Sequence, residues 1–568
     1  MHIDVVPNRT SRPAYLLRET YREDGKVKKR TVANLSALSD EQIRMIRAAL
    51  KGESLYSPDT LFNITASRAH GHVDAVRTAM TKLGMASLLN GRGCRERDLV
   101  MAMLAARVLA PQTKLATARW WHTTTLPEEF NVGDATETDL YGALDWLLER
   151  QDAIQKKLAK RHLGTSSLVL YDLSSSYFEG STCPLAQRGY SRDGKKGTLQ
   201  VNYGLLADRR GCPVAVSVYE GNTSDPQTLM PEIARLKQDF KVEELVIVGD
   251  RGMISQKAID ALSAQEGIEW ITALKSTSIR ALVSEGALQL DLFDERNLFE
   301  MSHADYPGER LVACRNPALA ALRAHKREDL LQATEAQLEK IRASVTNGRI
   351  KGEADIGVRV GKVVNRYKMA KHFELDIQGQ AFGFARKTES IEAEARLDGL
   401  YVIRTSVPEA SMDAAECVRQ YKSLAQVERA FRTLKSVDLR IRPIHHRLAD
   451  RVRAHILLCV LAYYVEWHMR EAWRELMFSD EDQAAKRTRD PVAPAKRSSA
   501  AKEKASSGKL ADGTPAHSFS TLLKELGTIV RNTCEANVPG SEAAVFCKTT
   551  MANAKQQRAL DLLREIKV

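Results

Sequence analysis

The order of apolar runs between residues 166 and 275 constrains the fold of this chain more than any other feature of its sequence. Three short runs have strand character and follow one another in hairpin order: 167–172, 199–207 and 213–219. Two helical segments and two further buried strands then alternate along the chain: 225–239, 245–249, 255–265 and 269–274. Hairpin connections make antiparallel neighbours, and helical crossovers make parallel ones. We therefore predict a mixed α/β sheet that is flanked by helices.

The α/β pattern stops after residue 275 and resumes near residue 398. The interruption contains short apolar runs and one charged helical segment, 327–344. An apolar run and two helical segments follow it in order: 400–404, 413–436 and 448–477. An insertion that splits one sheet domain explains this order better than two separate domains do. We therefore predict two parts of one core and an insertion subdomain between them: 166–275, 398–478 and 276–397.

The segments that flank the predicted core differ in composition. Residues 1–60 contain a hairpin signal and a helix start, and residues 61–165 have helical periodicity, which favours a helical domain. Residues 479–517 have no apolar period, and 486–509 contain eight basic and two acidic side chains. This composition predicts a disordered basic linker. The last segment, 518–568, returns to a helical pattern and is predicted to form C-terminal helices.

Charge and cysteine usage narrow the class of protein. The 568 residues include 84 Lys and Arg against 72 Asp and Glu, and the net charge of +12 favours a polyanionic partner such as nucleic acid. The eight cysteines form no Cys-x2-Cys pair, so we expect neither a zinc module nor a disulfide scaffold. The N-terminus lacks the pattern of a secretion signal, and the most apolar run, 454–465, is too short to span a bilayer. We therefore expect a cytoplasmic protein with no membrane partner.

Three acidic residues occupy positions where the side chains of a mixed sheet meet. Asp172 ends a predicted strand, Asp250 directly follows another, and Glu428 lies in the middle of a predicted helix. Acidic side chains at strand ends in the middle of a sheet are costly unless cations neutralise them. For either Asp alone, a turn or a helix N-cap is the alternative. The set of three favours a metal site built from carboxylates.

The helix around Glu428 carries two further patterns. Tyr421, Glu428 and Lys435 are spaced by seven residues, so they drift by only about 20° per step and form one line along the helix. An adjacent apolar stripe would pack against the sheet: Leu424, Val427, Phe431 and Leu434. Four basic side chains could contact DNA phosphates: Lys422, Arg429, Arg432 and Lys435. The alternative is an amphipathic helix with a solvated basic face, which explains the charges but not the placement of Glu428.

In these residues the chain is similar to DDE transposases of the insertion-sequence 4 superfamily, and most closely to the 1634-type group. The Glu helix of that family carries a Tyr-x2-Arg-x3-Glu-x6-Lys signature, which this chain matches in the line of three residues just described. Leu424 stands where the family has Arg, and we expect Lys422 or Arg429 to replace its phosphate contact. Four further segments carry the likeness: 171–175, 249–252, 398–401 and 442–446.

The resemblance implies an RNase H-like core, interrupted by an insertion and preceded by a helical domain. It implies that Asp172, Asp250 and Glu428 hold two Mg²⁺ or Mn²⁺ ions about 4 Å apart, with Asp172 on both. Tyr421 and Lys435 would hold the phosphate near the scissile bond. The expected activity is cleavage of DNA at terminal inverted repeats and transfer of the 3′-OH ends into target DNA, by a homodimer that pairs two ends.

Two other functions fit the sequence less well. A transposase-derived DNA-binding protein without catalysis would explain the missing Arg at the position of Leu424, although all three carboxylates persist. A general nuclease would cleave DNA without joining it. Metal-dependent strand cleavage separates the first alternative from a transposase, and joining of a 3′-OH end to a second duplex separates the second.

Overall fold

The computed structural model describes residues 1–9, 11–53, 61–289, 293–294, 297–537 and 544–568. They form two compact units. The first unit comprises Met1–Ala69 and Ile529–Met551, and the second comprises His70–Thr528 and Ala552–Val568. The predicted domain boundary at residue 60 lies outside the described residues. All candidate site residues belong to the second unit.

The first unit begins with a small antiparallel sheet and a helix. The sheet pairs three strands in the order β1-β2-β3: His2–Val6, Ala14–Glu23 and Lys26–Asn34. Asp24 and Gly25 turn the chain between the last two strands, and both have positive φ angles. Helix α1, Asp40–Leu50, follows Ser39, whose side chain forms a capping box with Gln42.

A second sheet in this unit joins segments from the two ends of the chain. Its strands have the order β17-β16-β4: Val545–Thr549, Val530–Ala536 and Phe62–Ala69. The last fifty residues therefore contain strands as well as the helices that their periodicity predicts. The difference arises because β16 pairs with β4, more than 460 residues earlier in the chain, and such pairing leaves no local pattern.

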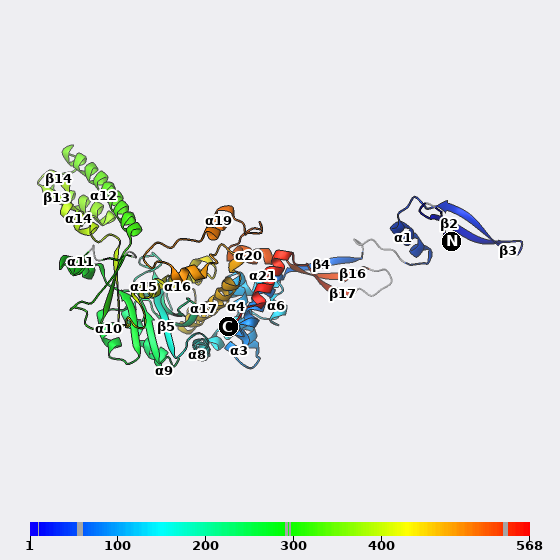
Figure 1. Cartoon of the computed structure of the whole chain (residues 1–568), viewed down its shortest axis with the longest axis horizontal. Coiled ribbons are helices and arrows are strands. Elements are labelled where there is room, and N and C mark those ends of the chain that lie inside the picture. Colours follow the sequence, from blue (N-terminus) through cyan, green and yellow to red (C-terminus); the bar gives the residue numbers. More distant parts are fainter. Residues whose placement is uncertain (10, 54–60, 290–292, 295–296, 538–543) are drawn as a thin grey trace. The chain divides into compact units, whose positions relative to one another are not determined.

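The second unit is built around a mixed sheet, which confirms the predicted α/β class (Figure 1). Nine strands belong to it in the described residues: β5 Ser166–Tyr177, β6 Gln187–Arg188, β7 Leu199–Asp208, β8 Pro213–Glu220, β9 Glu244–Val248, β10 Ile268–Ala273, β11 Leu298–Met301, β12 Arg310–Arg315 and β15 Leu400–Thr405. Their order is β11-β12-β15-β10-β9-β5-β7-β6, and β8 pairs with β7. Strands β5, β9 and β10 run parallel, and the other pairs are antiparallel. Helices α9, Asp225–Gln238, and α10, Gln256–Ser263, connect the strands around β9.

Part of the segment predicted as an insertion belongs to this sheet. Strands β11 and β12 extend it through the pairing of β12 with β15. Helix α11, Ser276–Ser284, precedes them. The remaining elements pack around their own apolar core, which includes Leu338, Ile356 and Phe382. They are α12 Pro317–Thr346, α13 Glu353–Tyr367, β13 Phe373–Gln378, β14 Ala381–Arg386 and α14 Thr388–Ala395. Edge pairing depends on the folded sheet, so the sequence could not separate these two parts.

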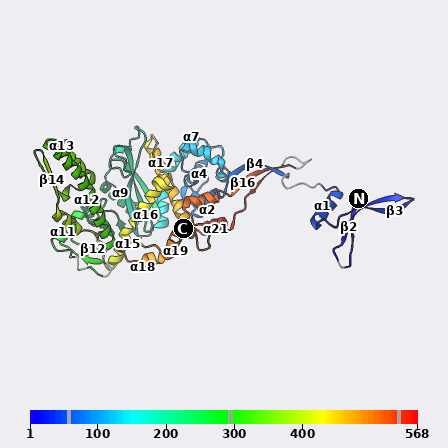
Figure 2. The ribbon, with the colours of Figure 1, turned by 90° about the horizontal axis from the view of Figure 1, so that it is seen from above.

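Helices that precede the sheet strands in the sequence pack together with a helix that follows them. The early ones are α2 Gly71–Lys82, α3 Met85–Leu89, α4 Arg95–Leu109, α5 Lys114–Trp120, α6 Leu126–Glu129, α7 Glu137–Leu148 and α8 Gln151–His162. Helix α17, Ala449–Ala472, lies between α4, α7 and strand β8 (Figure 2). Its residues 454–465 are all buried, as predicted for this apolar run. In the described residues no single helix is both long and apolar enough to cross a membrane, although α4 and Lys114–Thr123 meet that criterion as a pair bent by 88°.

Residues 479–517 are more ordered than their composition predicts. They contain two short helices, α18 Gln483–Thr488 and α19 Ser499–Ser507. Asp480 accepts hydrogen bonds from the backbone N–H and the hydroxyl of Ser498, both at 2.9 Å, and Val492 is buried. Caps and scattered buried side chains leave no periodic signal in a basic segment, so the prediction of a disordered linker is wrong here.

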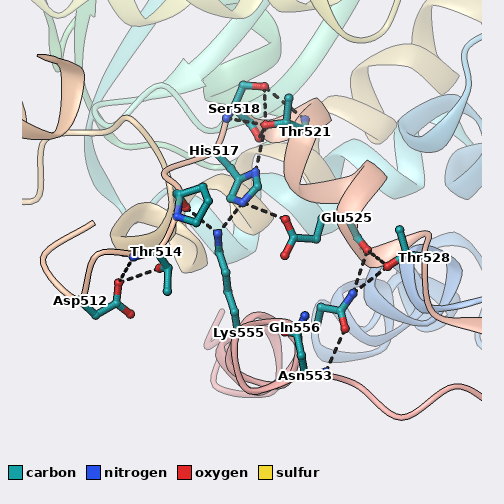
Figure 3. Close-up of polar contacts among 11 residues, drawn as sticks. Asp512, Thr514, His517, Ser518, Thr521, Glu525, Thr528, Asn553, Lys555 and Gln556 are labelled. Carbon is teal, nitrogen blue, oxygen red and sulfur yellow. Dashed lines mark hydrogen bonds and ion pairs between the residues drawn. The ribbon is translucent and has the colours of Figure 1, made fainter. Parts of the chain in front are cut away.

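The chain after α19 is joined to the C-terminal helices α20, Phe519–Leu526, and α21, Ala554–Arg564, by contacts around His517 (Figure 3). The Nε2 atom of His517 lies 2.6 Å from Nζ of Lys555 and 3.2 Å from Glu525. Burial and the charge of Lys555 lower the pKa of His517, so the neutral ring accepts a hydrogen bond from Lys555. This contact connects segments nearly 40 residues apart.

The Asp480–Ser498 contact can be tested with a variant. Asp480→Ala removes the two hydrogen bonds from Ser498 and a third from the Asp482 N–H, and we expect proteolytic cleavage between residues 486 and 509 to become roughly tenfold faster. Limited proteolysis followed by mass spectrometry measures this rate. Asp512→Ala, in an exposed turn beside Thr514, is the matched control and should leave the rate unchanged. Equal rates for both variants would contradict the assigned role of Asp480.

Candidate active site

Asp172 lies in strand β5, and Asp250 lies two residues after the end of the neighbouring parallel strand β9. In the register of β5 and β9, Leu170 pairs with Val248. Asp172 comes two residues after Leu170, and Asp250 comes two residues after Val248. Side chains two residues apart in an extended chain project from the same face. Because neighbouring strands lie about 4.8 Å apart, the register directs both carboxylates to one region of the sheet.

The prediction that a strand ends at Asp172 is wrong in one respect. Strand β5 continues to Tyr177, because its antiparallel pairing with β7 persists after β9 has ended at Val248. Asp172 therefore lies inside a strand, opposite Leu205, where the neighbour on the other side turns away. The backbone of Asp172 is therefore held by the pairing of β5 with β7, and no strand of the described residues pairs with it on the side of β9.

The electrostatic surroundings of Asp172 bring three carboxylates together. The pKa of Asp172 is raised to about 7, mainly by burial and also by the negative charges of Asp250 and Glu428, against the opposing effects of the Leu173 N–H and of Arg192. Like charges that act on one another in this way face a common region. The three acidic residues, far apart in the sequence, therefore lie close enough for their charges to act on Asp172.

Helix α16, Leu424–Arg432, packs against β5 and carries Glu428 (Figure 1). The apolar stripe predicted there is buried: Leu424, Val427, Phe431 and Leu434. The ring of Phe431 lies 5.7 Å from that of Tyr203, on β7. Glu428 is exposed beside this packed face, so its carboxylate is open to solvent.

The helix predicted around 413–436 is divided into three parts. Helix α15, Ala414–Lys422, ends at Ser423, α16 follows, and Thr433–Val437 form a π-helical stretch. A π-helical turn contains more residues than an α-helical turn, so it breaks the regular angular spacing. The predicted single line of three residues is therefore wrong for Lys435, which lies in the π-helical stretch.

The charges of the three carboxylates act on Tyr421. Burial raises its pKa to about 12, and Asp250, Glu428 and Asp172 raise it as well, while Arg251 lowers it. The phenol is therefore protonated at neutral pH and can donate a hydrogen bond. A hydroxyl that faces several carboxylates is suited to contact a phosphate oxygen bound among them.

The four predicted basic contacts divide into two pairs. Lys435 is buried and donates to Asp193 at 3.0 Å, and Lys422 donates to the backbone carbonyls of Pro491 and Val492. Both ammonium groups therefore already have partners within the chain. The side chains of Arg429 and Arg432 are exposed, and neither forms an ion pair with the part of the chain that the structure describes. Their guanidinium groups are available to phosphates.

Two family models match this chain. The transposase DDE domain matches residues 164–465, more than half of the chain, and the IS1634 family transposase N-terminal domain matches residues 3–60. The chain belongs to the DDE transposases of the IS1634 family. This confirms the predicted family and the predicted activity, because DDE transposases cleave and transfer DNA. The alternative of a DNA-binding protein without catalysis is not favoured.

The remaining comparisons are distant. A piggyBac transposase synaptic complex with hairpin DNA is 9% identical, with a TM-score of 0.33, over 80% of this transposase and 76% of that chain. A Mos1 transposase paired-end complex with the left transposon end is 14% identical, with a TM-score of 0.14, over 34% of this transposase and 63% of that chain. No curated protein matches the chain.

The donor set of this transposase fits the divalent metal ions that DDE transposases generally use. One oxygen of Asp172 accepts a hydrogen bond from the Leu173 N–H, and one oxygen of Asp250 accepts from the N–H groups of Gly252 and Met253. Within the described residues no hydrogen bond engages their second oxygens or either oxygen of Glu428. Free carboxylate oxygens are the ligands that Mg²⁺ and Mn²⁺ prefer.

Tight clusters of three or more metal-ligand atoms occur elsewhere in the described residues. The ligand atoms of His162, Cys212 and His468 lie within 4.8 Å of one another, and the three predicted carboxylates do not form such a cluster. Burial lowers the pKa of His162 to about 4 and that of His468 to about 3, so both rings are neutral. The cysteine and histidine spacing gave no sign of this cluster, because its members come from three separate elements.

Asp193 is a site residue that the sequence reasoning missed. It lies in a loop, 188–196, that contains four Lys and Arg side chains. The sequence therefore predicts a basic loop and gives no role to its one carboxylate. Its buried carboxylate binds both Lys435 and Arg442. Burial alone would raise the pKa of Asp193, but these two cations outweigh burial and lower it. A lone acidic residue among basic ones was the available signal.

Proposed function

We propose that this transposase cleaves DNA at insertion-sequence ends and joins the ends to target DNA, with Asp172, Asp250 and Glu428 as the catalytic carboxylates of an RNase H-like core. The observation that carries this proposal is the register of β5 and β9, which favours one region of the sheet for both Asp side chains. The mutual effect of the three charges supports the same grouping.

These three carboxylates would hold Mg²⁺ or Mn²⁺. The ions would act as Lewis acids that activate a water or 3′-hydroxyl nucleophile and stabilise the leaving oxygen of the cleaved strand. Their ligand atoms do not all lie within 4.8 Å, which suits carboxylates shared between two ions better than three ligands on one ion. The partly buried Asp172, central in the sheet, is suited to contact both ions.

The other side chains of the site would bind and orient DNA. The protonated hydroxyl of Tyr421 donates a hydrogen bond to a phosphate oxygen near the scissile bond. Arg429 and Arg432 contact the backbone on the exposed face of α16. Lys422 and Lys435 exchange their present carbonyl and carboxylate partners for phosphate oxygens when DNA binds.

The DNA partners would be the terminal inverted repeats of the element and the target duplex. We place recognition of the ends in the helices of residues 61–165 and pairing of two ends in a homodimer. Because its DNA substrates lie inside the cell that produces it, we propose that the transposase acts in the cytoplasm. These assignments rest on the family to which the chain belongs.

The test combines cleavage and joining in one assay. Purified transposase, Mg²⁺ and a labelled duplex ending in the inverted repeat should give a strand cut at the repeat end and a product joined to a second duplex. Chelation of the metal should reduce both products to background. Cleavage without joining would mean that the protein acts as a nuclease and not as a transposase. Equal cleavage with and without metal would exclude the carboxylate mechanism.

A further inference from the structure

A strongly basic pocket lies between the early helices and the start of α17. Its volume is about 740 Å³. Six cationic side chains line it: Arg107, Lys114, Arg440, Arg442, Arg447 and Arg451. They come from α4, α5, the segment after the π-helical stretch, and α17. No Asp or Glu lines the pocket, which is unusual for so many cations around one cavity.

The two innermost cations are buried without a carboxylate partner in the described residues. Arg107 is 6% exposed and donates to the backbone carbonyls of Leu439 and Gln112, at 3.4 and 3.1 Å. Lys114 is 4% exposed, and its ammonium lies 3.4 Å from Nδ1 of His455. Burial lowers the pKa of Lys114 to about 7, and the charge of Arg107 lowers it as well. A buried positive charge with no anion is costly, so the pocket is incomplete without an anion.

His455 holds the ammonium of Lys114 in place. Its Nε2 lies 3.1 Å from the carbonyl oxygen of Ile441, to which it donates, and this leaves Nδ1 as an acceptor for Lys114. Burial and the neighbouring cations keep the ring neutral, because they lower its pKa well below the ordinary value. A neutral ring orients Lys114 without adding a charge, and an anion bound beside Lys114 would favour the charged ammonium and offset the lowering of its pKa.

The rim of the pocket leads toward the candidate active site. Arg442 at the rim binds Asp193, and the same carboxylate binds Lys435 on the helix segment that follows Glu428. Arg440 and Arg447 at the rim are exposed and form no ion pair in the described residues. Several cations that lie between a cleavage site and an anion pocket favour a ligand with more than one negative charge, such as a nucleic-acid backbone.

We propose that this basic pocket binds a phosphate group of the DNA backbone, at a point separate from the three carboxylates. The proposal rests on the proposed function, because it takes the phosphate to belong to the DNA that the transposase cuts. Lys114 and Arg107 contact the phosphate at the base of the pocket, and Arg440 and Arg447 contact flanking phosphates at its rim. The pocket thereby fixes the path of the DNA relative to the cleavage site.

The test measures DNA binding without chemistry. Fluorescence anisotropy with a labelled duplex carrying the terminal repeat, in the presence of EDTA, gives affinity as a function of salt concentration. Lys114→Met should weaken binding roughly tenfold and reduce the slope of log affinity against log salt by about one. Arg447→Gln, at the exposed rim, should reduce the slope similarly and cannot disturb the core.

Thermal unfolding separates a binding role from a structural one. Lys114→Met replaces a buried, unneutralised cation with an apolar side chain, so its unfolding midpoint should rise, by roughly 2 °C, while DNA binding falls. Lys82→Met, at an exposed position on α2, is the matched control and should change neither quantity. Unchanged affinity and slope in both pocket variants would overturn the proposal.

A second ligand identifies the source of the phosphate. Inorganic phosphate should raise the unfolding midpoint of the wild type but not of Lys114→Met, in support of a phosphate site. If inorganic phosphate does so while both pocket variants bind duplex normally, a small phosphate compound is the ligand and the DNA assignment is overturned. Failure of the proposed function would appear differently, as wild-type protein that binds DNA but does not cleave it with Mg²⁺.

Discussion

Asp172→Asn is expected to abolish DNA cleavage and strand transfer, with a loss of at least about 10³-fold in the cleavage rate. The asparagine keeps the size of the side chain but removes the negative charge that would hold the metal ions. A factor of 10³ corresponds to about 4 kcal/mol of transition-state stabilisation, which is modest for metal ions that neutralise a developing charge. Single-turnover cleavage of a labelled terminal repeat measures this loss.

The same variant should be more stable than the wild type in metal-free buffer at pH 8. The folded-state pKa of Asp172 is about 7, above its ordinary value of 3.8, so the folded protein binds the proton more tightly than the unfolded chain does. The free energy of unfolding of the wild type therefore falls as the pH rises from about 4 to about 7, by roughly 2–4 kcal/mol at most. The variant does not undergo this loss, because asparagine does not titrate. Denaturation at pH 5 and pH 8 with EDTA should show the difference between the variants growing with pH.

A matched control separates the site from the general effect of losing a carboxylate. Asp239 is exposed and forms an ion pair with Lys156 at 3.0 Å. Asp239→Asn should cleave at the wild-type rate and show no gain of stability at pH 8. DNA affinity should remain within about twofold of the wild type in both variants. Retention of cleavage by Asp172→Asn would remove Asp172 from the proposed mechanism.

Gly221→Ala is expected to destabilise the fold by about 3 kcal/mol or more. A Cβ atom at this position would lie 2.0 Å from the carbonyl oxygen of Gln200 and 2.6 Å from that of Gln187. Both contacts are with backbone, so the strands themselves would have to move apart. Chemical denaturation should show a lower midpoint, and the intact protein should show faster hydrogen exchange along β6 and β7.

This destabilisation should also reach the candidate site. Gly189 approaches the carbonyl oxygen of Gly221 so closely that its own Cβ would lie 2.1 Å away, and the loop that follows carries Arg192 and Asp193. Displacement of this loop would move Arg192, whose charge favours the ionised form of Asp172. We therefore expect cleavage to fall even in the fraction of Gly221→Ala that remains folded.

Gly142→Ala is the matched control for this substitution. Gly142 lies in helix α7, a Cβ atom added there would meet no neighbouring atom within 4 Å, and its φ angle is not positive. Alanine is the better helix former, so this variant should gain about 0.5–1 kcal/mol. A similar loss of stability in both variants would mean that close backbone approach is not what requires glycine at position 221.

The sequence alone was sufficient for the class of the core and for the family. Both follow from local signals: apolar runs of strand length, helical spacing, and acidic residues such as Asp250 at the end of a run. The apolar stripe of α16 was predicted for the same reason, because a buried helix face repeats with the helical period and is buried as expected at Val427 and Phe431. The roles of the three carboxylates stay predictions until cleavage is measured.

Tertiary structure decided what depends on contacts between distant segments. Only the folded chain shows that Asp193 forms an ion pair with Lys435, that Val492 is buried, and that β16 pairs with β4. The basic pocket likewise draws Lys114 and Arg447 from segments more than 300 residues apart. Periodicity records which face of an element is buried but not which partner buries it, so these pairings are determined only when the whole chain packs.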